Sequence, residues 1–382
     1  MMTSDTILQN IRNMKRLKSL DVLRGLTVAL MILVNNGAGD EIYGALQHSK
    51  WNGLTPCDLV FPFFLFMVGM STYLSLKKTN FLPSAAIFKK IAKRTILLFV
   101  IGVAINWFDM ICDNRPLDFA HLRIWGVMQR IALCYGAVAI LAITIKHRYF
   151  LHVIMGLLIL YMGILVIGNG YAYDASINIL SQVDLSLFGY DHLYHKSPVD
   201  PEGLLSTIPA IAHTMIGFWC CMNIQRTRQA VESKIKILKY SGLVMVLLGF
   251  ILSIIGFGIN KRIWSPSFVF VTCGFASWFL GLLIQFIDNR KIAEDMELNK
   301  EKDSWLCKIW LIFGMNPLFL YVMSEALGIV FGAFDIKASI FTAIHEVISN
   351  GYLASLVYAI FFVSIHGIMG YWLYKKRIFI KI

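Results

Sequence analysis

Apolar residues fall in blocks of about 20 along this chain, separated by short polar or basic segments. A helix needs about 20 residues to cross roughly 30 Å of hydrocarbon, so each block predicts one transmembrane helix. The pattern predicts an all-α, polytopic integral membrane protein with about ten transmembrane helices. The expected spans are 20–36, 57–76, 91–107, 126–145, 149–167, 204–223, 240–257, 265–286, 306–330 and 352–374.

The basic residues predict how these spans are oriented. If the N-terminus is cytoplasmic, the segments on that side hold 27 of the 35 lysines and arginines, Arg24 included. Such an excess is typical of the cytoplasmic loops of membrane proteins. We therefore expect both termini in the cytoplasm, with residues 1–19 as a cytoplasmic N-terminal segment and residues 20–382 as one membrane domain.

Composition agrees with a membrane protein and limits the partners. Hydrophobic residues make up 57% of the chain and charged residues 15%, whereas soluble domains have roughly 45–50% and about 25%. The net charge of +12 is spread over the predicted cytoplasmic loops, which suits anionic lipid headgroups rather than nucleic acid. The seven cysteines show no metal-binding spacing, so we expect no metal.

The most polar stretch of the predicted membrane region is 48–63, which carries His48, Trp51, Asn52 and Asp58 where a loop re-enters the bilayer as a helix. Each of these groups costs free energy in a membrane unless it is hydrogen-bonded or wetted. The segment is therefore a candidate reaction centre. The alternative is a polar loop that its own hydrogen bonds hold in place.

Further polar residues lie on the predicted outer side, and they suit a polar, hydroxyl-rich or cationic ligand. With Trp51 and Asn52, the candidate ligand-binding residues are Arg130, Asp191, His192 and Glu202. Arg130 lies inside a predicted span, where an arginine needs a partner. Asp58 or Glu325 could supply it, either in a structural ion pair or in a binding site.

Basic residues at the inner ends of two predicted spans suit the phosphates of a nucleotide cofactor. The candidates are Arg24, Lys93 and Arg94, and the alternative is that they only anchor the helices at the cytoplasmic surface. The chain has no HExxH, P-loop, GxSxG or glycine-rich dinucleotide turn. It thus lacks the motifs of serine hydrolases and of ATP-driven pumps.

Nine short motifs, in order from residue 19 to the end, resemble the heparan-α-glucosaminide N-acetyltransferase family of membrane acyltransferases. The motifs are SLDVLRG (19–25), VNNGAG (34–39), HSKWNGLTPCDLVFPFF (48–64), RIWGVMQR (123–130), DHLYHK (191–196), DPEGLLSTIP (200–209), NKRIWSPSFV (260–269), GMNPLFLYV (314–322) and YKKRIFIKI (374–382).

The resemblance implies acetyl-CoA (CoA) as the acyl donor, entering from the cytoplasm, and an amino sugar such as glucosamine as acceptor on the far side of the membrane. It also implies that His48 is the active-site histidine and Asn35 its companion. The animal enzyme of the family has an extra domain and one more span before its SLDVLRG-like motif. Neither precedes this motif here, so we expect a bacterial type in the inner (plasma) membrane, whose acceptor need not be heparan.

The residue chemistry fits this expectation. A neutral imidazole can take the proton of an amine at neutral pH, and the Asn35 amide can stabilise the oxyanion of a tetrahedral intermediate. Asp58 could orient the imidazole or hold the sugar amine. His48 could act as the base in a ternary complex or carry the acetyl group covalently, and the sequence leaves both open.

The sequence therefore predicts an acetyl-CoA-dependent N-acetyltransferase. Two alternatives remain at this stage: a transporter that moves amino sugars unmodified, and an O-acyltransferase that acts on a surface polysaccharide. A homodimer is also compatible with the sequence.

Overall fold

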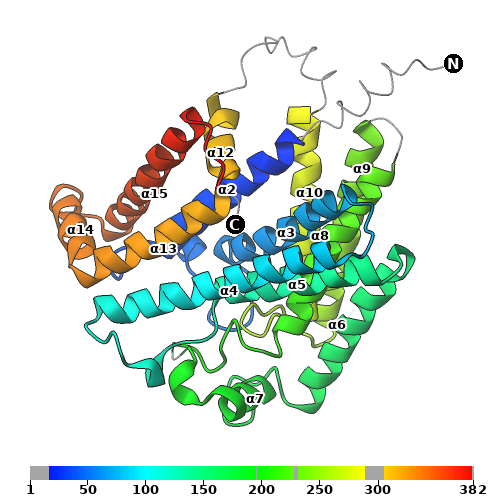
Figure 1. The fold of residues 1–382 in the computed structure, drawn as a ribbon. Helices are drawn as coiled ribbons and strands as arrows, with labels where there is room; N and C mark the ends of the chain where they lie inside the picture. Colours follow the sequence, from blue (N-terminus) through cyan, green and yellow to red (C-terminus); the bar gives the residue numbers. More distant parts are fainter. Residues whose placement is uncertain (1–16, 195, 228–230, 289–304, 381–382) are drawn as a thin grey trace.

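The computed structural model describes residues 17–194, 196–227, 231–288 and 305–380, and within these ranges the chain forms helices and loops without a β-strand (Figure 1). The longer helices are α2 (Lys18–Asn35), α3 (Val60–Lys77), α4 (Ala85–Cys112), α5 (Val127–Thr144), α6 (Phe150–Ile167), α8 (Thr207–Arg226), α9 (Val231–Ile254), α10 (Pro266–Leu283), α13 (Pro317–Ala333) and α15 (Gly351–Lys375). The shorter ones are α7 (Ile179–Phe188), α12 (Trp305–Met315) and α14 (Ile336–Val347). Single turns form η1 (Gly44–Leu46), η2 (Pro56–Leu59), η3 (Phe119–His121), η4 (His147–Tyr149), η5 (Tyr190–His192) and η6 (Ile284–Asp288). Nearly all of the predicted cytoplasmic segment 1–19 lies outside the described residues.

Eight of the described helices are long and apolar enough to cross a membrane, and the bent pair α12–α13 makes a ninth if it counts as one span. The predicted first span coincides with α2, whose eighteen residues include the charged Lys18, Asp21 and Arg24. Length and composition alone therefore do not mark α2 as a span. The all-α, polytopic membrane fold is confirmed, while the count of ten and the cytoplasmic position of both termini stay predictions.

The predicted span 306–330 is not one continuous helix. It breaks at Asn316, and α12 and α13 meet at 80°. Pro317 follows the break and lacks the N–H that would continue the hydrogen bonds of α12. The Asn316 side chain instead donates to the carbonyl of Ile378 (2.9 Å) and accepts from the N–H of Ile380 (2.8 Å). The break thus binds the segment that follows α15.

The helices form an inner and an outer layer. Most of the residues of α3, α5, α8 and α10 are buried, whereas fewer than a third of those in the apolar stretches of α4, α6 and α9 are. Close contacts between small residues hold the inner layer together, as expected where lipid is as apolar as the side chains. Gly69 of α3 packs against the Thr214 carbonyl of α8, and Gly217 of α8 packs against the Phe66 carbonyl of α3.

The loop between α6 and α8 closes around a buried charge. Arg130 is fully buried, and its guanidinium donates to the Gly203 carbonyl and to the Ser206 hydroxyl. On the other side of this turn the Leu204 N–H donates to Asp184 (3.0 Å), whose pKa responds to the charge of Arg130. The prediction that Asp58 or Glu325 is the partner of Arg130 is therefore wrong. The turn at 203–206 and Asp184, which are distant in sequence, take their place.

We expect Gly69→Ala to destabilise the protein by about 1–3 kcal/mol, because an added Cβ would overlap the Thr214 carbonyl oxygen and push α3 from α8. The matched control is Gly163→Ala in α6, where a Cβ would meet no atom within 4 Å. That change should leave the melting temperature unchanged or raise it slightly, since alanine is the better helix former. Thermal unfolding of both purified variants tests this packing, and equal melting temperatures would contradict it.

Asp184 predicts a pH dependence of stability. Burial raises the pKa of this carboxyl from 3.8 to about 6, so folding takes up a proton between these two values. Its contribution of roughly 3 kcal/mol is complete below pH 3.8 and is lost as the pH rises through 6. Asp184→Asn should remove that loss, and the exposed Asp191→Asn should not. Unfolding curves measured from pH 4 to 7 test this, and parallel pH profiles for wild type and Asp184→Asn would refute it.

Candidate active site

A buried carboxylate organises the polar segment before α3. Asp58 lies in η2 with its side chain 0% exposed. Its Oδ2 accepts hydrogen bonds from the N–H groups of Ser49 and Thr55 and from the Thr55 hydroxyl, at 3.0–3.1 Å. Its Oδ1 lies 2.8 Å from His48 Nδ1. The segment from 48 to 58 is thus folded around a single side chain, and the imidazole is fixed at its rim.

Lys261 joins this pair from the loop between α9 and α10. Its Nζ lies 2.9 Å from His48 Nδ1 and 3.5 Å from Asp58 Oδ1, and its side chain is only 12% exposed. Burial lowers the pKa of Lys261, against the opposing effect of Asp58. Lys261 was not among the predicted site residues. The available signal was its position in the motif NKRIWSPSFV (260–269).

Hydrogen bonds fix the Lys261 loop to the His48 segment. The Gly53 N–H donates to the Ile259 carbonyl (2.8 Å), and the Asn260 amide donates to Asn52 (3.3 Å). Asn52, predicted to bind substrate, thus contacts the neighbour of Lys261. Cys57 also approaches the imidazole, with Sγ 3.1 Å from His48 Nδ1.

This arrangement can hold His48 as a base. When Nδ1–H donates to Asp58, Nε2 carries the lone pair and can accept a proton. The negative charge of Asp58 also stabilises the imidazolium that forms, as in other carboxylate–histidine pairs. The cluster therefore provides an oriented proton acceptor at the edge of the membrane region.

Asn35, at the end of α2, lies in a second polar group. Its Nδ2 donates to Glu325 Oε1 of α13 at 3.4 Å. Both residues line a cavity of about 400 Å³ together with Asp109 and Lys337. The convergence of Asn35 and His48 on one carbonyl stays a prediction, since the contact found for the Asn35 amide is to Glu325. A primary amide has a second N–H, which can still serve an oxyanion.

Arg123 connects the loops that carry Asp200, Glu202 and Tyr194. Its Nη2 donates to Asp200 (3.1 Å) and to Glu202 (3.0 Å), and its guanidinium lies 4.7 Å from the ring centre of Tyr194. Glu202, a predicted substrate residue, acts electrostatically on both Lys261 and Glu325. The charge of Glu202 therefore affects both the His48 cluster and the group around Asn35.

The other predicted substrate residues have different surroundings. His192 is hydrogen-bonded to the Leu122 carbonyl (2.6 Å), and Asp191 lies at the surface, 3.9 Å from His121. Trp51 donates to the Tyr171 carbonyl (3.1 Å). Arg130 makes its hydrogen bonds inside the protein, as described above. Among the predicted site residues, His48 and Asp58 thus lie next to Lys261. Asn52 contacts the neighbouring Asn260, and Glu202 acts on Lys261 electrostatically.

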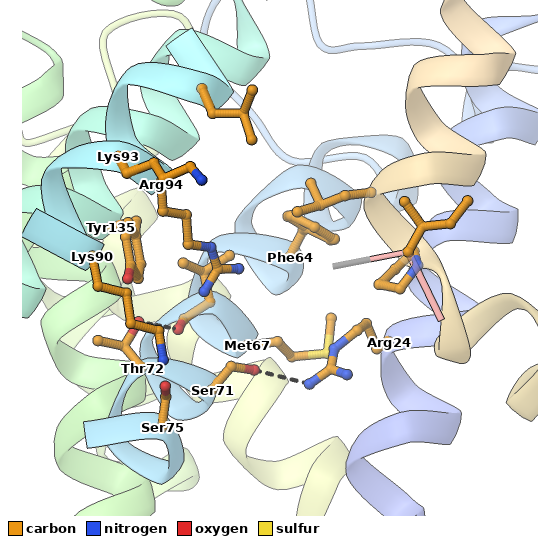
Figure 2. Close-up of a pocket in the computed structure, with 15 residues that line it drawn as sticks. Arg24, Phe64, Met67, Ser71, Thr72, Ser75, Lys90, Lys93, Arg94 and Tyr135 are labelled. Atoms are coloured by element: carbon orange, nitrogen blue, oxygen red, sulfur yellow. Dashed lines mark hydrogen bonds between the residues drawn. The ribbon is translucent and has the colours of Figure 1, made fainter. Parts of the chain in front are cut away.

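The three predicted cofactor-binding residues lie in one cavity of about 470 Å³ (Figure 2). Arg24 enters it from α2, and Lys93 and Arg94 enter it from α4, with Lys90 as a fourth basic residue. Hydroxyl groups of α3 lie between them. Most of the apolar lining comes from α3 and α13, and Leu97, Tyr135 and Ile380 complete it. The lining residues of α3 and α13 are Phe64, Met67, Val68, Ser71, Thr72, Ser75, Pro317 and Leu318.

The basic groups of this cavity are positioned for an anion. Arg24 donates to Ser71 (2.8 Å) and to Asp21 (3.1 Å). Arg94 stacks 4.5 Å above the Tyr135 ring, and its Nε is buried without a hydrogen-bond partner. A buried guanidinium N–H with no acceptor costs free energy unless a ligand supplies one. Phosphate oxygens are suitable acceptors, so the cavity fits a phosphorylated ligand. Among the described residues, no three His, Cys, Asp or Glu side chains form a metal site.

Comparison with known proteins identifies the family. Residues 16–251 match the family model described as "Heparan-alpha-glucosaminide N-acetyltransferase, catalytic". The chain is 29% identical to the human heparan-alpha-glucosaminide N-acetyltransferase over 427 residues, and 28% identical to the mouse protein over 429. Each alignment covers 96% of this chain and 60% of the relative, so the chain spans 60% of the length of these curated relatives. Because the family match covers more than half of the chain, this protein belongs to the heparan-alpha-glucosaminide N-acetyltransferase family, through its catalytic region.

Proposed function

We propose that this protein transfers an acetyl group from cytoplasmic acetyl-CoA to the amine of an amino sugar or glycan at the outer face of the membrane. The observation that carries the proposal is that α3 connects two different polar centres. Its residues 64–75 line the basic cavity, and the turn before it holds Asp58 beside His48. The names of the relatives, N-acetyltransferases of a glucosaminide, support the same reaction.

The basic cavity is the binding site for the nucleotide end of the donor. Arg24, Lys93 and Arg94 bind the phosphates, and Lys90 adds a fourth positive charge. Ser71 is separated from Asp58 by thirteen residues, roughly 20 Å along a helix. A pantetheine arm that runs along the apolar side chains of α3 bridges most of this distance. The thioester then reaches the outer centre while the phosphates stay at the inner one.

His48 is the base of the transfer. Its Nε2 accepts the proton of the sugar amine as the nitrogen bonds to the acetyl carbon and the carbon–sulfur bond breaks, which leaves CoA as a thiol or thiolate. Asp58 holds the imidazole through Nδ1, and Lys261 balances the charge of Asp58. The second N–H of Asn35 stabilises the oxyanion. A covalent acetyl-histidine is the alternative role of His48.

The acceptor approaches from the side of the loops that carry Trp51, Asn52 and Glu202. The topology that this requires has both termini in the cytoplasm, and we propose a bacterial inner membrane as the location.

Substitution of His48 tests the proposal. We expect His48→Ala to lower acetyl transfer by about 10²–10⁴, since a positioned base is lost. Asn35→Ala should lower it by about 10²–10³ through loss of an oxyanion donor. The control is His152→Ala on the exposed face of α6. Transfer to glucosamine and thermal stability are measured on the same preparations. Normal turnover per folded His48→Ala molecule would show that His48 only stabilises a polar loop.

Binding of CoA tests the donor site and separates the enzyme from a sugar carrier. Arg94→Gln should weaken the binding of CoA by about tenfold or more, since an arginine–phosphate hydrogen bond is lost. Arg115→Gln, in an exposed outer loop, is the matched control and should bind like wild type. Calorimetric titration measures both. Wild-type protein that binds amino sugars but no CoA would favour a transporter.

A further inference from the structure

Lys261 makes with His48 the contact that the proposed reaction assigns to the amine of the acceptor. Its Nζ lies 2.9 Å from His48 Nδ1 and 3.2 Å from Nε2. When Nδ1–H donates to Asp58, Nε2 carries the lone pair, so an N–H of Lys261 can donate to the atom that takes the proton in the transfer. A primary amine of the protein itself therefore lies beside the proposed base.

An ion pair with Asp58 alone does not explain this position of Lys261. Nζ is 3.5 Å from Asp58 Oδ1, which is longer than a normal hydrogen bond, and it is closer to both nitrogens of the imidazole. A lysine that only balanced the charge would make its shortest contact with the carboxylate. The geometry therefore brings the amine to His48, with the carboxylate as a second neighbour.

The turn that carries Lys261 keeps the amine in this place. The Asn260 side chain accepts a hydrogen bond from the Arg262 N–H (2.8 Å). The Trp264 N–H donates to the Lys261 carbonyl (3.1 Å), and the turn is joined to the His48 segment by the hydrogen bonds described above. Because the backbone is fixed, Nζ stays within reach of the imidazole. Such proximity strongly raises the rate of a reaction between two groups.

Lys261 can also react as a neutral amine. Burial lowers its pKa, although Asp58 opposes this effect. A lysine becomes a nucleophile once it has lost a proton, which a lowered pKa favours. The His48 side chain is 39% exposed, so the imidazole can pass a proton on to water. The cluster therefore holds an amine nucleophile and its base together before any acceptor arrives.

We infer that Lys261 is itself an acetyl acceptor, which the protein modifies from acetyl-CoA when no amino sugar is present. The inference rests on the proposed function, because it uses the same donor and the same base. The neutral Nζ attacks the acetyl carbon, Nε2 of His48 takes the proton that the nitrogen loses, and the carbon–sulfur bond breaks. The products are an amide at Lys261 and the thiol of CoA, to which His48 returns the proton.

Acetylation of Lys261 would stop the transfer reaction. The amide is neutral, so the buried charge of Asp58 loses a partner. The acetyl group also occupies the position beside Nε2 of His48 that a sugar amine needs. The modification therefore inactivates the enzyme when acetyl-CoA is present without an acceptor.

Mass spectrometry of the wild-type protein tests this inference. The protein is incubated without acceptor in acetyl-CoA that carries a deuterated acetyl group, and the labelling of its lysines is followed in peptides. Lys337 is the matched reference, because burial lowers its pKa as well and it lines the Asn35 cavity. We expect Lys261 to be labelled about 10² times faster than Lys337 or more, since it has a positioned base. Neutral hydroxylamine removes an acetyl group from imidazole but not from lysine, so the label that survives it is an amide.

Two variants test whether the label arises by the proposed reaction. His48→Ala should lower the labelling rate of Lys261 by about 10²–10⁴, because the base is lost. Arg94→Gln should lower it by about tenfold at a low concentration of acetyl-CoA, because the donor binds more weakly. Lys337 should be labelled at the wild-type rate in both variants, which shows that the fold is retained.

The outcomes separate this inference from the proposed function. Label on Lys261 without transfer to glucosamine would support the inference and contradict the proposed acceptor. Transfer to glucosamine with no label on Lys261 would overturn the inference and keep the proposed function. Equal rates for Lys261 and Lys337, or a Lys261 rate that His48→Ala leaves unchanged, would also overturn the inference.

Discussion

The hydrogen bonds and ion pairs of one buried carboxylate, Asp58, hold the centre around His48 together. It has no solvent exposure, and its oxygens bind two backbone N–H groups, one hydroxyl, one imidazole and one ammonium group. An uncompensated charge in this position would cost several kcal/mol. The charge of Asp58 therefore fixes the position of the loop from 48 to 55, which supplies N–H groups, and of Lys261, which supplies a positive charge. The orientation of His48 follows from the same requirement.

Two kinds of helix contact position this centre relative to the basic cavity. Glycines bring α3 and α8 into direct contact, so the wall that connects the two sites is well packed. The bend at Asn316, by contrast, separates two helices. It turns α13 away from α12 and brings Pro317 and Leu318 to the cavity. A straight helix over 306–330 would carry these residues elsewhere. The cavity thus depends on an interruption as much as on regular helices.

Much of the fold could be predicted because membrane spans leave a strong pattern of apolar residues. Every predicted span has a helix or a bent pair at its position. The bend at Asn316 was missed although Asn-Pro is visible in the motif at 314–322, because a proline in an apolar run can also begin a helix or be tolerated within a span. The twelve-residue helix α14 was missed because it is shorter than a span.

The candidate site was less predictable, since it depends on contacts between distant segments. The spacing of ten residues allowed His48 and Asp58 to be paired, but Lys261 is 213 residues from His48. Arg130 was paired with the wrong carboxylates because the charge of a residue does not show which loop covers it. Arg24, Lys93 and Arg94 could be grouped because all three lie near predicted helix ends on the same side. That Glu325 is the partner of Asn35 could be seen only from the folded structure.

Because α3 runs without a break from the turn that holds Asp58 to the basic cavity, it fixes the distance between these two sites. The interval from Asp58 to Ser71, which runs through the end of η2 and then along α3, sets a nearly fixed separation of roughly 20 Å that no local side-chain motion can shorten. If the basic cavity binds the donor as proposed, an acyl donor would be selected by the length of its flexible arm as well as by its phosphates. A small acetyl donor could enter the His48 centre but would not be bound by the basic cavity. A donor with a shorter arm could bind in the basic cavity, but its thioester would not reach His48. Discrimination by length needs no movement of the helices, so it would persist in a rigid protein.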